Sequence, residues 1–288
     1  MSILEKIYAR ARERNAKVVF PELGDPRVAK AAARLQADGL CQPMPLADIC
    51  DAQIEVLTQA RGMKEAIARR LLAKPLYRAA AMVATGQADA MVAGADSATK
   101  RVIEAASIAI GLDPKITTPS SFFLMLFPDG RSLIFTDCAV NVAPSQDELI
   151  DIARATAASA QGLLGAPRVA LLSYSTGESG QGHSVDLTRG AANALADLGI
   201  DSFGPIQADA ALNQAIAAKK GVQSGDFNVF VFPDLNAGNI GYKLCQELAS
   251  AQALGPFLQG FRKPVCDLSR GASVEDIVAA TAVTVATG

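Results

Sequence analysis

A hydroxyl, a guanidinium and a carboxylate lie close together near the end of the sequence, at Ser269, Arg270 and Asp276. Their segment, Lys263 to Ile277, is typical of a short buried strand, a turn and the start of a helix. Backbone N–H groups gather at such a turn and favour an anion such as phosphate. Arg270 would add a planar fork for two hydrogen bonds, and Asp276 a base. The segment therefore carries the groups for acyl or phosphoryl transfer.

The same turn also has a structural interpretation. Ser273 to Asp276 fits the capping box, in which a serine begins a helix and an acidic side chain three residues later returns to the serine amide. Capping boxes are common and catalytic carboxylates are few. From this motif alone both interpretations stay open.

Two other loops offer polar groups after predicted strands. Tyr174 to Ser184 is rich in glycine and hydroxyl residues and could wrap a phosphate, but it lacks the spacing of a nucleotide-binding loop. It is either a connecting loop or a ligand contact. Asp137 to Asn141 ends a strand, where ligands collect in open α/β sheets. Cys138 is there either a nucleophile or a packed core residue.

Composition and charge exclude several classes of partner and site. The chain has 288 residues, 50% hydrophobic, with a net charge of −2 and no charge block, so neither nucleic acid nor an anionic membrane is an expected partner. Its five cysteines form no C-x-x-C pair, and His183 is the only histidine, so no metal site is expected. The first residues are charged and no apolar run reaches the roughly 18 residues of a membrane span. We expect a cytoplasmic protein.

Apolar runs alternate with alanine-rich helical stretches, which predicts an α/β protein with strands buried on both faces. Pro128 to Gly130 separates two apolar runs as a hairpin turn would, so we expect a mixed sheet. The predicted strands are 17–21, 88–93, 121–127, 132–136, 168–174, 228–233 and 264–267. The predicted helices are 26–37, 74–85, 100–111, 146–163, 185–198, 239–248 and 274–285. Between Cys41 and Leu57 the helix and strand signals disagree.

Taken together, several segments resemble the phosphate acetyltransferase family, within the phosphate acetyl and butyryl transferases. The matching segments run from near the first predicted strand to the last predicted helix. They are Phe20-Pro-Glu-Leu-Gly-Asp-Pro-Arg27, Ala88-Asp-Ala-Met-Val-Ala-Gly-Ala95, Ser120-Ser-Phe-Phe-Leu-Met125, Thr136-Asp-Cys-Ala-Val-Asn141, Val231-Phe-Pro-Asp-Leu-Asn-Ala-Gly-Asn-Ile-Gly-Tyr-Lys243 and Gly255-Pro-Phe-Leu-Gln-Gly-Phe-Arg-Lys-Pro-Val-Cys-Asp-Leu-Ser-Arg-Gly271.

The resemblance implies acetyl-CoA + phosphate ⇌ acetyl phosphate + CoA, without a metal or other cofactor, since CoA is a substrate. It implies two α/β domains with mixed, mostly parallel sheets around a cleft, similar to isocitrate and isopropylmalate dehydrogenases, and a homodimer. The first domain would take residues 1–124 plus 264–288, and the second 125–263. The hairpin agrees with this division, whereas the return of the C-terminus comes from the resemblance.

By the same resemblance, Asp276 takes the proton of the CoA thiol, while Ser269 and Arg270 hold the phosphate. Further substrate-binding candidates come from the matching segments and the glycine-rich loop: Arg27, Ser120, Ser121, Cys138, Asn141, Ser175 and Thr176. Glu104, Asp113 and Thr58 stand where the family commonly has arginines. These departures leave two alternatives beside acetyl transfer: a propionyl or butyryl transferase, and a catalytically weak domain that binds acyl-CoA.

Overall fold

The computed structural model describes residues 2–222 and 226–288, without the side chains of residues 60 and 61. The chain divides into two compact units, Met1–Lys115 with Gly255–Gly288, and Ile116–Leu254. The chain passes from the first unit to the second after residue 115 and returns to the first after residue 254. The sequence analysis placed these two boundaries after residues 124 and 263. The domain assignment itself stays a prediction.

The first unit contains a sheet in which parallel strands predominate. Its strand order is β2 (Gln42–Met44), β1 (Lys17–Val19), β3 (Ala90–Ala93), β10 (Val265–Asp267) and β9 (Gln252–Gln259), of which residues 255–259 belong to this unit. The first four are parallel, and β9 runs antiparallel to β10. The carboxyl ends of β1, β3 and β10 therefore meet at one edge.

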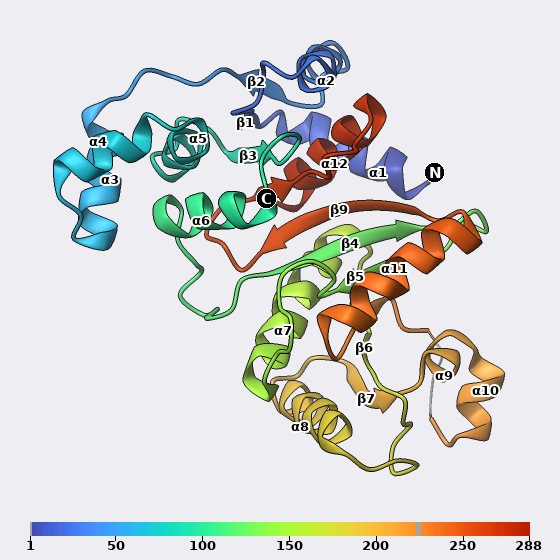
Figure 1. The fold of residues 1–288 in the computed structure, drawn as a ribbon. Helices are drawn as coiled ribbons and strands as arrows, with labels where there is room; N and C mark the ends of the chain where they lie inside the picture. The colour runs from blue at the N-terminus through green and yellow to red at the C-terminus, as the bar shows by residue number, and fades with distance from the viewer. Residues whose placement is uncertain (1, 223–225) are drawn as a thin grey trace. The chain divides into compact units, whose positions relative to one another are not determined.

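Seven described helices belong to this unit, and Figure 1 labels each of them. They are α1 (Ile3–Arg14), α2 (Pro26–Ala37), α3 (Asp51–Arg61), α4 (Glu65–Leu72), α5 (Pro75–Ala84), α6 (Thr99–Ala109) and α12 (Val274–Thr287). Helix α12 packs against α1 and α2, and every side chain from Ile277 to Ala286 is buried. This burial explains why its sequence is apolar all round rather than amphipathic.

The second unit has strands in the order β4 (Ser120–Leu126), β5 (Ser132–Thr136), β8 (Val229–Val231), β6 (Val169–Leu172) and β7 (Ser202–Ile206). β4 and β5 form the predicted antiparallel hairpin, and the other pairings are parallel. Its described helices are α7 (Gln146–Leu163), α8 (His183–Asp197), α9 (Ala208–Leu212), α10 (Gln214–Lys219) and α11 (Leu235–Ala249).

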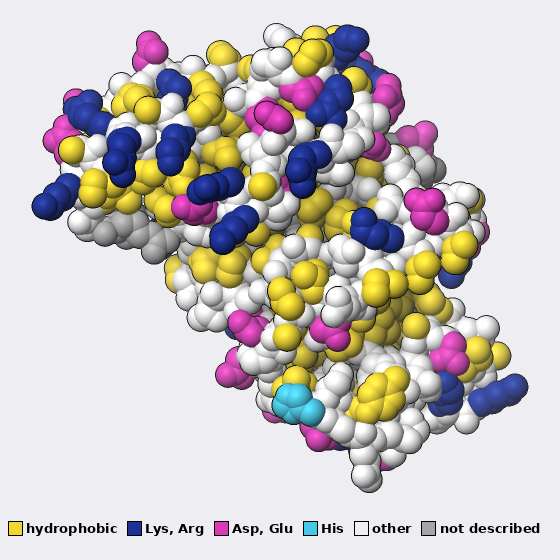
Figure 2. Space-filling model, in the orientation of Figure 1, with side chains coloured by type: hydrophobic (Ala, Val, Ile, Leu, Met, Phe, Trp, Pro, Cys, Tyr) yellow, Lys and Arg dark blue, Asp and Glu magenta, His cyan; other side chains and the backbone are white. Residues whose placement is uncertain are grey.

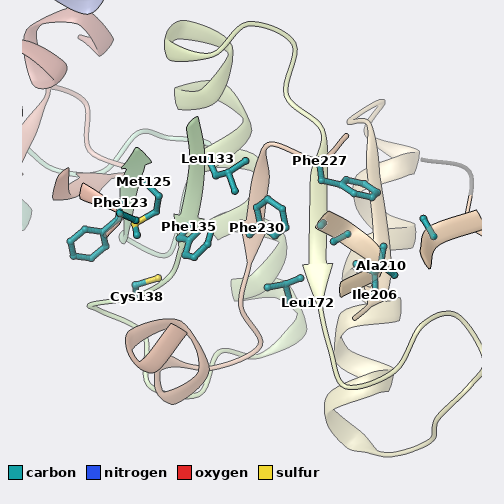
Figure 3. Close-up of a cluster of buried hydrophobic side chains, with 14 of the residues drawn as sticks. Phe123, Met125, Leu133, Phe135, Cys138, Leu172, Ile206, Ala210, Phe227 and Phe230 are labelled. Atoms are coloured by element: carbon teal, nitrogen blue, oxygen red, sulfur yellow. The ribbon is translucent and has the colours of Figure 1, made fainter. Parts of the chain in front are cut away.

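Aromatic side chains from neighbouring strands fill the core of the second unit (Figure 3). The ring of Phe135 lies 5.6 Å from that of Phe230 and 5.2 Å from that of Phe232, measured between centroids. Cys138 belongs to the same buried cluster. Offset and edge-on contacts of this kind stabilise a core beyond the apolar area that they bury.

The α/β class with mixed, mostly parallel sheets is confirmed, as are all seven predicted strands and all seven predicted helices. The bounds of β5, α2 and α7 are as predicted, and the ends of the others are shifted. Strands β2, β7 and β9 were missed because each contains a proline, which lacks the N–H of a central strand and argues against one. The disputed stretch after Cys41 contains β2 and the start of α3. Among the described residues, no helix combines the length and the apolarity needed to cross a bilayer.

Candidate active site

Three loops of the first unit leave the same edge of its sheet, after β1, β3 and β10. Two of them make close backbone contact: the N–H of Leu268 donates to the carbonyl oxygen of Ala93 at 2.6 Å. Gly94 between them has φ +104°, and a side chain there would come within 2.4 Å of Asp267 Oδ1. A residue without Cβ is therefore required where the loops after β3 and β10 meet.

The predicted catalytic residues Ser269 and Arg270 lie in the turn between β10 and α12, and both are exposed. The turn is ordered by its own backbone, since the N–H of Ala272 donates to the carbonyl oxygen of Ser269 at 2.9 Å. The Ser269 hydroxyl also accepts from the N–H of Gly271 at 3.3 Å. A short, internally bonded turn thus presents a hydroxyl and a guanidinium side by side.

Asp276 forms the capping box that the sequence suggested. The Ser273 N–H and hydroxyl donate to Asp276 Oδ2 at 3.0 and 2.8 Å, and the Asp276 N–H donates back to Ser273 Oγ at 3.1 Å. The box uses Oδ2 alone, and the side chain is half-buried. Capping fixes the carboxylate at the start of α12 and is compatible with a catalytic role, which stays a prediction.

Asp267 is a buried carboxyl at the end of β10 that the sequence analysis did not select. Its side chain is 1% exposed; Oδ2 accepts from the Thr99 hydroxyl at 2.6 Å, whereas the buried Oδ1 has no hydrogen-bond partner. The pKa of Asp267 is raised to about 7, mainly by burial; the Thr99 hydrogen bond opposes this rise, and the charge of Glu22 adds to it. Burial disfavours the charged carboxylate because it removes the water that would solvate it.

We expect the stability of the protein to fall as the pH rises through the titration of Asp267. An unfolded aspartate ionises near pH 3.9, so between about pH 4 and 7 the folded state alone keeps this proton. The stabilisation is complete below about pH 4, decreases by up to about 1.4 kcal/mol per pH unit above that, and is fully lost once the pH has risen through the folded pKa of about 7. Urea unfolding at pH 5 and pH 8 should therefore show a decline that Asp267→Asn reduces by a few kcal/mol. Equal declines in the two proteins would contradict this.

In the second unit, Asp137 gathers the groups at the carboxyl end of β5. Its carboxylate accepts from the Ser121 hydroxyl, from Asn141 Nδ2 at 2.6 Å, and from the backbone N–H groups of Ala139, Val140 and Asn141. Asn141 Nδ2 also donates to the carbonyl oxygen of Pro119 at 3.1 Å. Asp137 therefore fixes two of the predicted substrate-binding residues, Ser121 and Asn141. Ser120 and Ser121 are both fully buried.

The start of α11 lies directly on this loop. A side chain at Gly238 would come within 2.4 Å of the Asp137 carbonyl oxygen, and Asn239 Nδ2 donates to the Cys138 carbonyl oxygen at 3.1 Å. Asp234 caps α11 by accepting from the N–H of Ala237 at 2.9 Å. The polar residues at the start of α11 thus include a cap, Asp234, and a loop anchor, Asn239, and the contact requires glycine at 238.

Cys138 is fully buried, and burial, followed by the nearby Asp137 charge, raises the pKa of its thiol well above the ordinary value. A protonated, inaccessible thiol is a poor nucleophile. We therefore expect Cys138→Ala to keep turnover within about fivefold of the parent, with a loss of stability of about 1 kcal/mol from the smaller side chain. Steady-state kinetics and thermal unfolding measure the two effects. A labelled acetyl group trapped on Cys138 would overturn this expectation.

The glycine-rich loop after β6 is held by its own side chains. The backbone N–H of Thr176 donates to Ser179 Oγ at 2.9 Å, and Ser175 Oγ lies 3.2 Å from the same oxygen. Thr176 Oγ1 also accepts from the backbone N–H of Gln207, after β7, at 3.1 Å. Ser175 and Thr176 are both buried. Their hydroxyls stabilise the loop, and their contact with substrate stays a prediction.

The structure thus groups the predicted residues unit by unit. In the first unit Arg27 donates to the carbonyl oxygen of Arg270, beside Ser269, and in the second Asp137 joins Ser121 to Asn141. Sequence reasoning gave no role to Asp137 or Asp267, although an aspartate at the end of an apolar strand marked both. Among the described residues, no three His, Cys, Asp or Glu side chains gather as metal ligands would.

Residues 45–285 match the family model "Phosphate acetyl/butaryl transferase". The chain belongs to this family. The phosphate acetyltransferase of Paracoccus denitrificans is 41% identical over 99% of this chain and 98% of that protein. A phosphotransacetylase from Streptococcus pyogenes, solved by crystallography, overlays with a TM-score of 0.91 at 36% identity, over 99% of this chain and 98% of that one.

Other members of the family are longer than this chain. The phosphate acetyltransferase of Nitrosomonas europaea is 39% identical over 97% of this chain, but the chain spans only 45% of that protein.

Glu104, Asp113 and Thr58, the three residues where the resemblance led us to expect arginines, all have local contacts. Glu104 accepts from Tyr77 and pairs with Arg101 at 3.1 Å. The Tyr77 hydrogen bond is the main cause that lowers the pKa of Glu104. Asp113 accepts from the backbone N–H of Lys115 at 2.8 Å, and the Thr58 hydroxyl donates to the Glu55 carbonyl oxygen at 3.0 Å. Local partners thus satisfy each of the three side chains.

Proposed function

We propose that this protein transfers an acetyl group between CoA and inorganic phosphate, acetyl-CoA + phosphate ⇌ acetyl phosphate + CoA. Family membership carries the proposal, since the matched relatives are named phosphate acetyltransferases. The turn of Ser269 and Arg270 supports it, because an exposed hydroxyl and guanidinium beside a helix start are suited to bind a phosphate group.

In the direction that forms acetyl-CoA, Asp276 accepts the proton of the CoA thiol. A thiol with an ordinary pKa near 8.5 is mostly protonated at neutral pH, so a nearby base raises the fraction of thiolate. The thiolate sulfur forms a bond to the carbonyl carbon of acetyl phosphate, and the bond from that carbon to the phosphate oxygen breaks. Phosphate leaves with the bonding electrons. Ser269 and Arg270 stabilise the negative charge that grows on it.

The test follows thiolester formation with purified protein, CoA and an acyl phosphate. Acetyl, propionyl and butyryl phosphate should be compared at equal concentration, and we expect the highest kcat/KM with acetyl phosphate. A preference for butyryl phosphate would assign another acyl group to the same mechanism. Binding of acetyl-CoA without turnover of any of the three would refute the transferase function and favour an acyl-CoA-binding domain.

Restoring the usual family charge at two positions should strengthen anion binding. Glu104→Arg combined with Asp113→Arg replaces two carboxylates by guanidinium groups, and we expect CoA or acetyl phosphate to bind about two- to fivefold more tightly per position at low salt. Calorimetry at low and high ionic strength measures the gain, which salt should screen. Unchanged affinity at low salt would place both positions away from the substrates.

The proposal includes a cytoplasmic homodimer that uses no metal or other cofactor. A stripe on α11 supports self-association: Ile240, Leu244 and Leu248 recur every four residues and are exposed, Leu248 by 80%. Hydrophobic side chains are visible along this helix in Figure 2. Apolar stripes of this kind favour a protein partner. Sedimentation of the parent and of Leu244→Glu should give a dimer and a weakened dimer; a monomeric parent would refute this part.

A further inference from the structure

Every N–H donor of the Arg27 guanidinium has a partner within the first unit. Nε and Nη2 donate to the two carboxylate oxygens of Asp25, at 3.2 and 2.7 Å. Nη1 donates to the carbonyl oxygens of Arg270 and Ala272, at 2.7 and 3.0 Å, and Nη2 also donates to that of Ala95, at 3.1 Å. A guanidinium has five N–H bonds, and all five are used. Arg27 has no donor left for a phosphate group.

These contacts connect the three loops at the carboxyl edge of the sheet. Arg27 and Asp25 lie after β1, Ala95 lies after β3, and Arg270 and Ala272 lie after β10. Glu22, also after β1, accepts from the N–H groups of Ala95, Asp96 and Ser97, at 2.8, 3.3 and 2.8 Å. The loop after β1 therefore binds the loop after β3 through both a carboxylate and a guanidinium.

The contact with the loop after β10 is the one that concerns catalysis. There Arg27 Nη1 donates to the backbone on both sides of Gly271, at the carbonyl oxygens of Arg270 and Ala272. Glycine is the most permissive backbone, so a turn that contains it needs outside restraint to keep one conformation. The Arg27 fork supplies that restraint, because its planar geometry fixes two acceptors at once.

We propose that Arg27 is a positioning residue that acts through Arg270, rather than a substrate-binding residue as its motif suggested. By holding the Arg270 and Ala272 carbonyl groups, Arg27 fixes the direction in which the Arg270 side chain leaves the turn. The inference rests on the proposed function in one respect, namely that Arg270 contacts the phosphate group. Misplacement of a catalytic group by as little as 1 Å can cost about a hundredfold in rate.

The first test is a double-mutant cycle of Arg27→Lys and Arg270→Lys, with kcat and KM measured for acetyl phosphate and CoA. Lysine keeps the charge but cannot bridge the carbonyl groups. We expect Arg27→Lys to lower kcat/KM for acetyl phosphate about ten- to hundredfold in the parent, and less than about threefold when Arg270 is already lysine. A residue that binds substrate directly would show the same loss in both backgrounds, and that result would overturn the proposal.

Arg34→Lys is the matched control. Arg34 lies on the same helix and also reaches the first turn of α12, where it pairs with Glu275 at 3.4 Å, but the pair is exposed. Exposed pairs contribute little, so we expect kinetics within about twofold of the parent. Should Arg27→Lys fail to fold, Asp25→Asn serves as the second variant: asparagine keeps the cap of α2 but loses the charge that orients Arg27. Asp25→Asn should lower kcat/KM for acetyl phosphate by less than Arg27→Lys does. It should cause no further loss when Arg270 is already lysine.

Hydrogen exchange gives a readout that does not depend on activity. In Arg27→Lys the amides of residues 269–273 should exchange at least about tenfold faster, with little change in β5 or α7. Unchanged exchange of the turn, or a uniform rise across the protein, would refute the positioning role. If the parent protein shows no acyl transfer, the proposed function fails, while the exchange experiment still decides whether Arg27 restrains the turn.

Discussion

Asp276→Asn is expected to lower turnover by about two to four orders of magnitude, the range associated with the loss of a general base. Asparagine cannot accept the thiol proton, so only the small fraction of CoA that is already ionised would react. The fold should persist, because an asparagine oxygen can still accept from the Ser273 N–H and hydroxyl that bind Asp276 Oδ2 in the parent. Turnover and thermal unfolding, measured on one preparation, separate the two effects.

Glu275→Gln is the control for this prediction. Glu275 is the neighbouring acidic residue in the first turn of α12, and its side chain is 70% exposed. It contributes the same charge near the helix start but lies outside the capping box, so its kinetics should stay within about twofold of the parent. If Asp276→Asn kept turnover within threefold, Asp276 would not be the base. Loss of the cooperative unfolding transition would instead show that the capping box is its main role.

The sequence predicted the strands that continuous apolar runs mark and most of the helices that follow them, because local patterns determine these elements. Helices α1, α3, α4, α9 and α10 were not predicted. β5 (Ser132–Thr136) and α7 (Gln146–Leu163) were predicted with the observed bounds. A turn of Pro, Asp and Gly follows β4 and precedes β5, and the structure shows that Ser145 caps α7. β9 was not predicted, because Gly255 and Pro256 interrupt it. Its place depends on pairing with β10, a contact that no local pattern specifies.

The residues of the candidate site likewise fall into those that a local motif reveals and those whose role depends on distant partners. Ser269, Arg270 and Asp276 lie in one contiguous motif, and the capping box was visible as a spacing of three residues. The roles of Asp137 and Arg27 depend on distant partners: Asp137 binds Ser121 from the preceding strand, and Arg27 binds a carbonyl group 243 residues away. Both residues stood in matching motifs. A motif shows that a side chain is needed, whereas the hydrogen bonds show whether it holds the substrate or the protein.

Arg270→Lys is expected to lower kcat/KM for acetyl phosphate by about 10- to 100-fold, with CoA affected less. Lysine keeps a positive charge near the phosphate but replaces a planar fork by a single ammonium group, which loses one of two parallel hydrogen bonds. Arg270→Gln removes the charge as well and should cost about 10²- to 10³-fold, as the loss of a preorganised donor does in other enzymes. Kinetics with each substrate varied in turn distinguish the two.

The graded pair of substitutions identifies what Arg270 contributes. If charge alone were needed, lysine would restore most of the rate that glutamine loses, and if geometry alone were needed, the two would be equally impaired. We expect an intermediate result, since the phosphate gains charge while its oxygens keep fixed directions. Arg262→Lys is the control: Arg262 is exposed in the same unit and donates to the Leu112 carbonyl oxygen at 3.1 Å. Parent-like kinetics in both Arg270 variants would place Arg270 outside the active site and leave the anion to the backbone N–H groups of the turn.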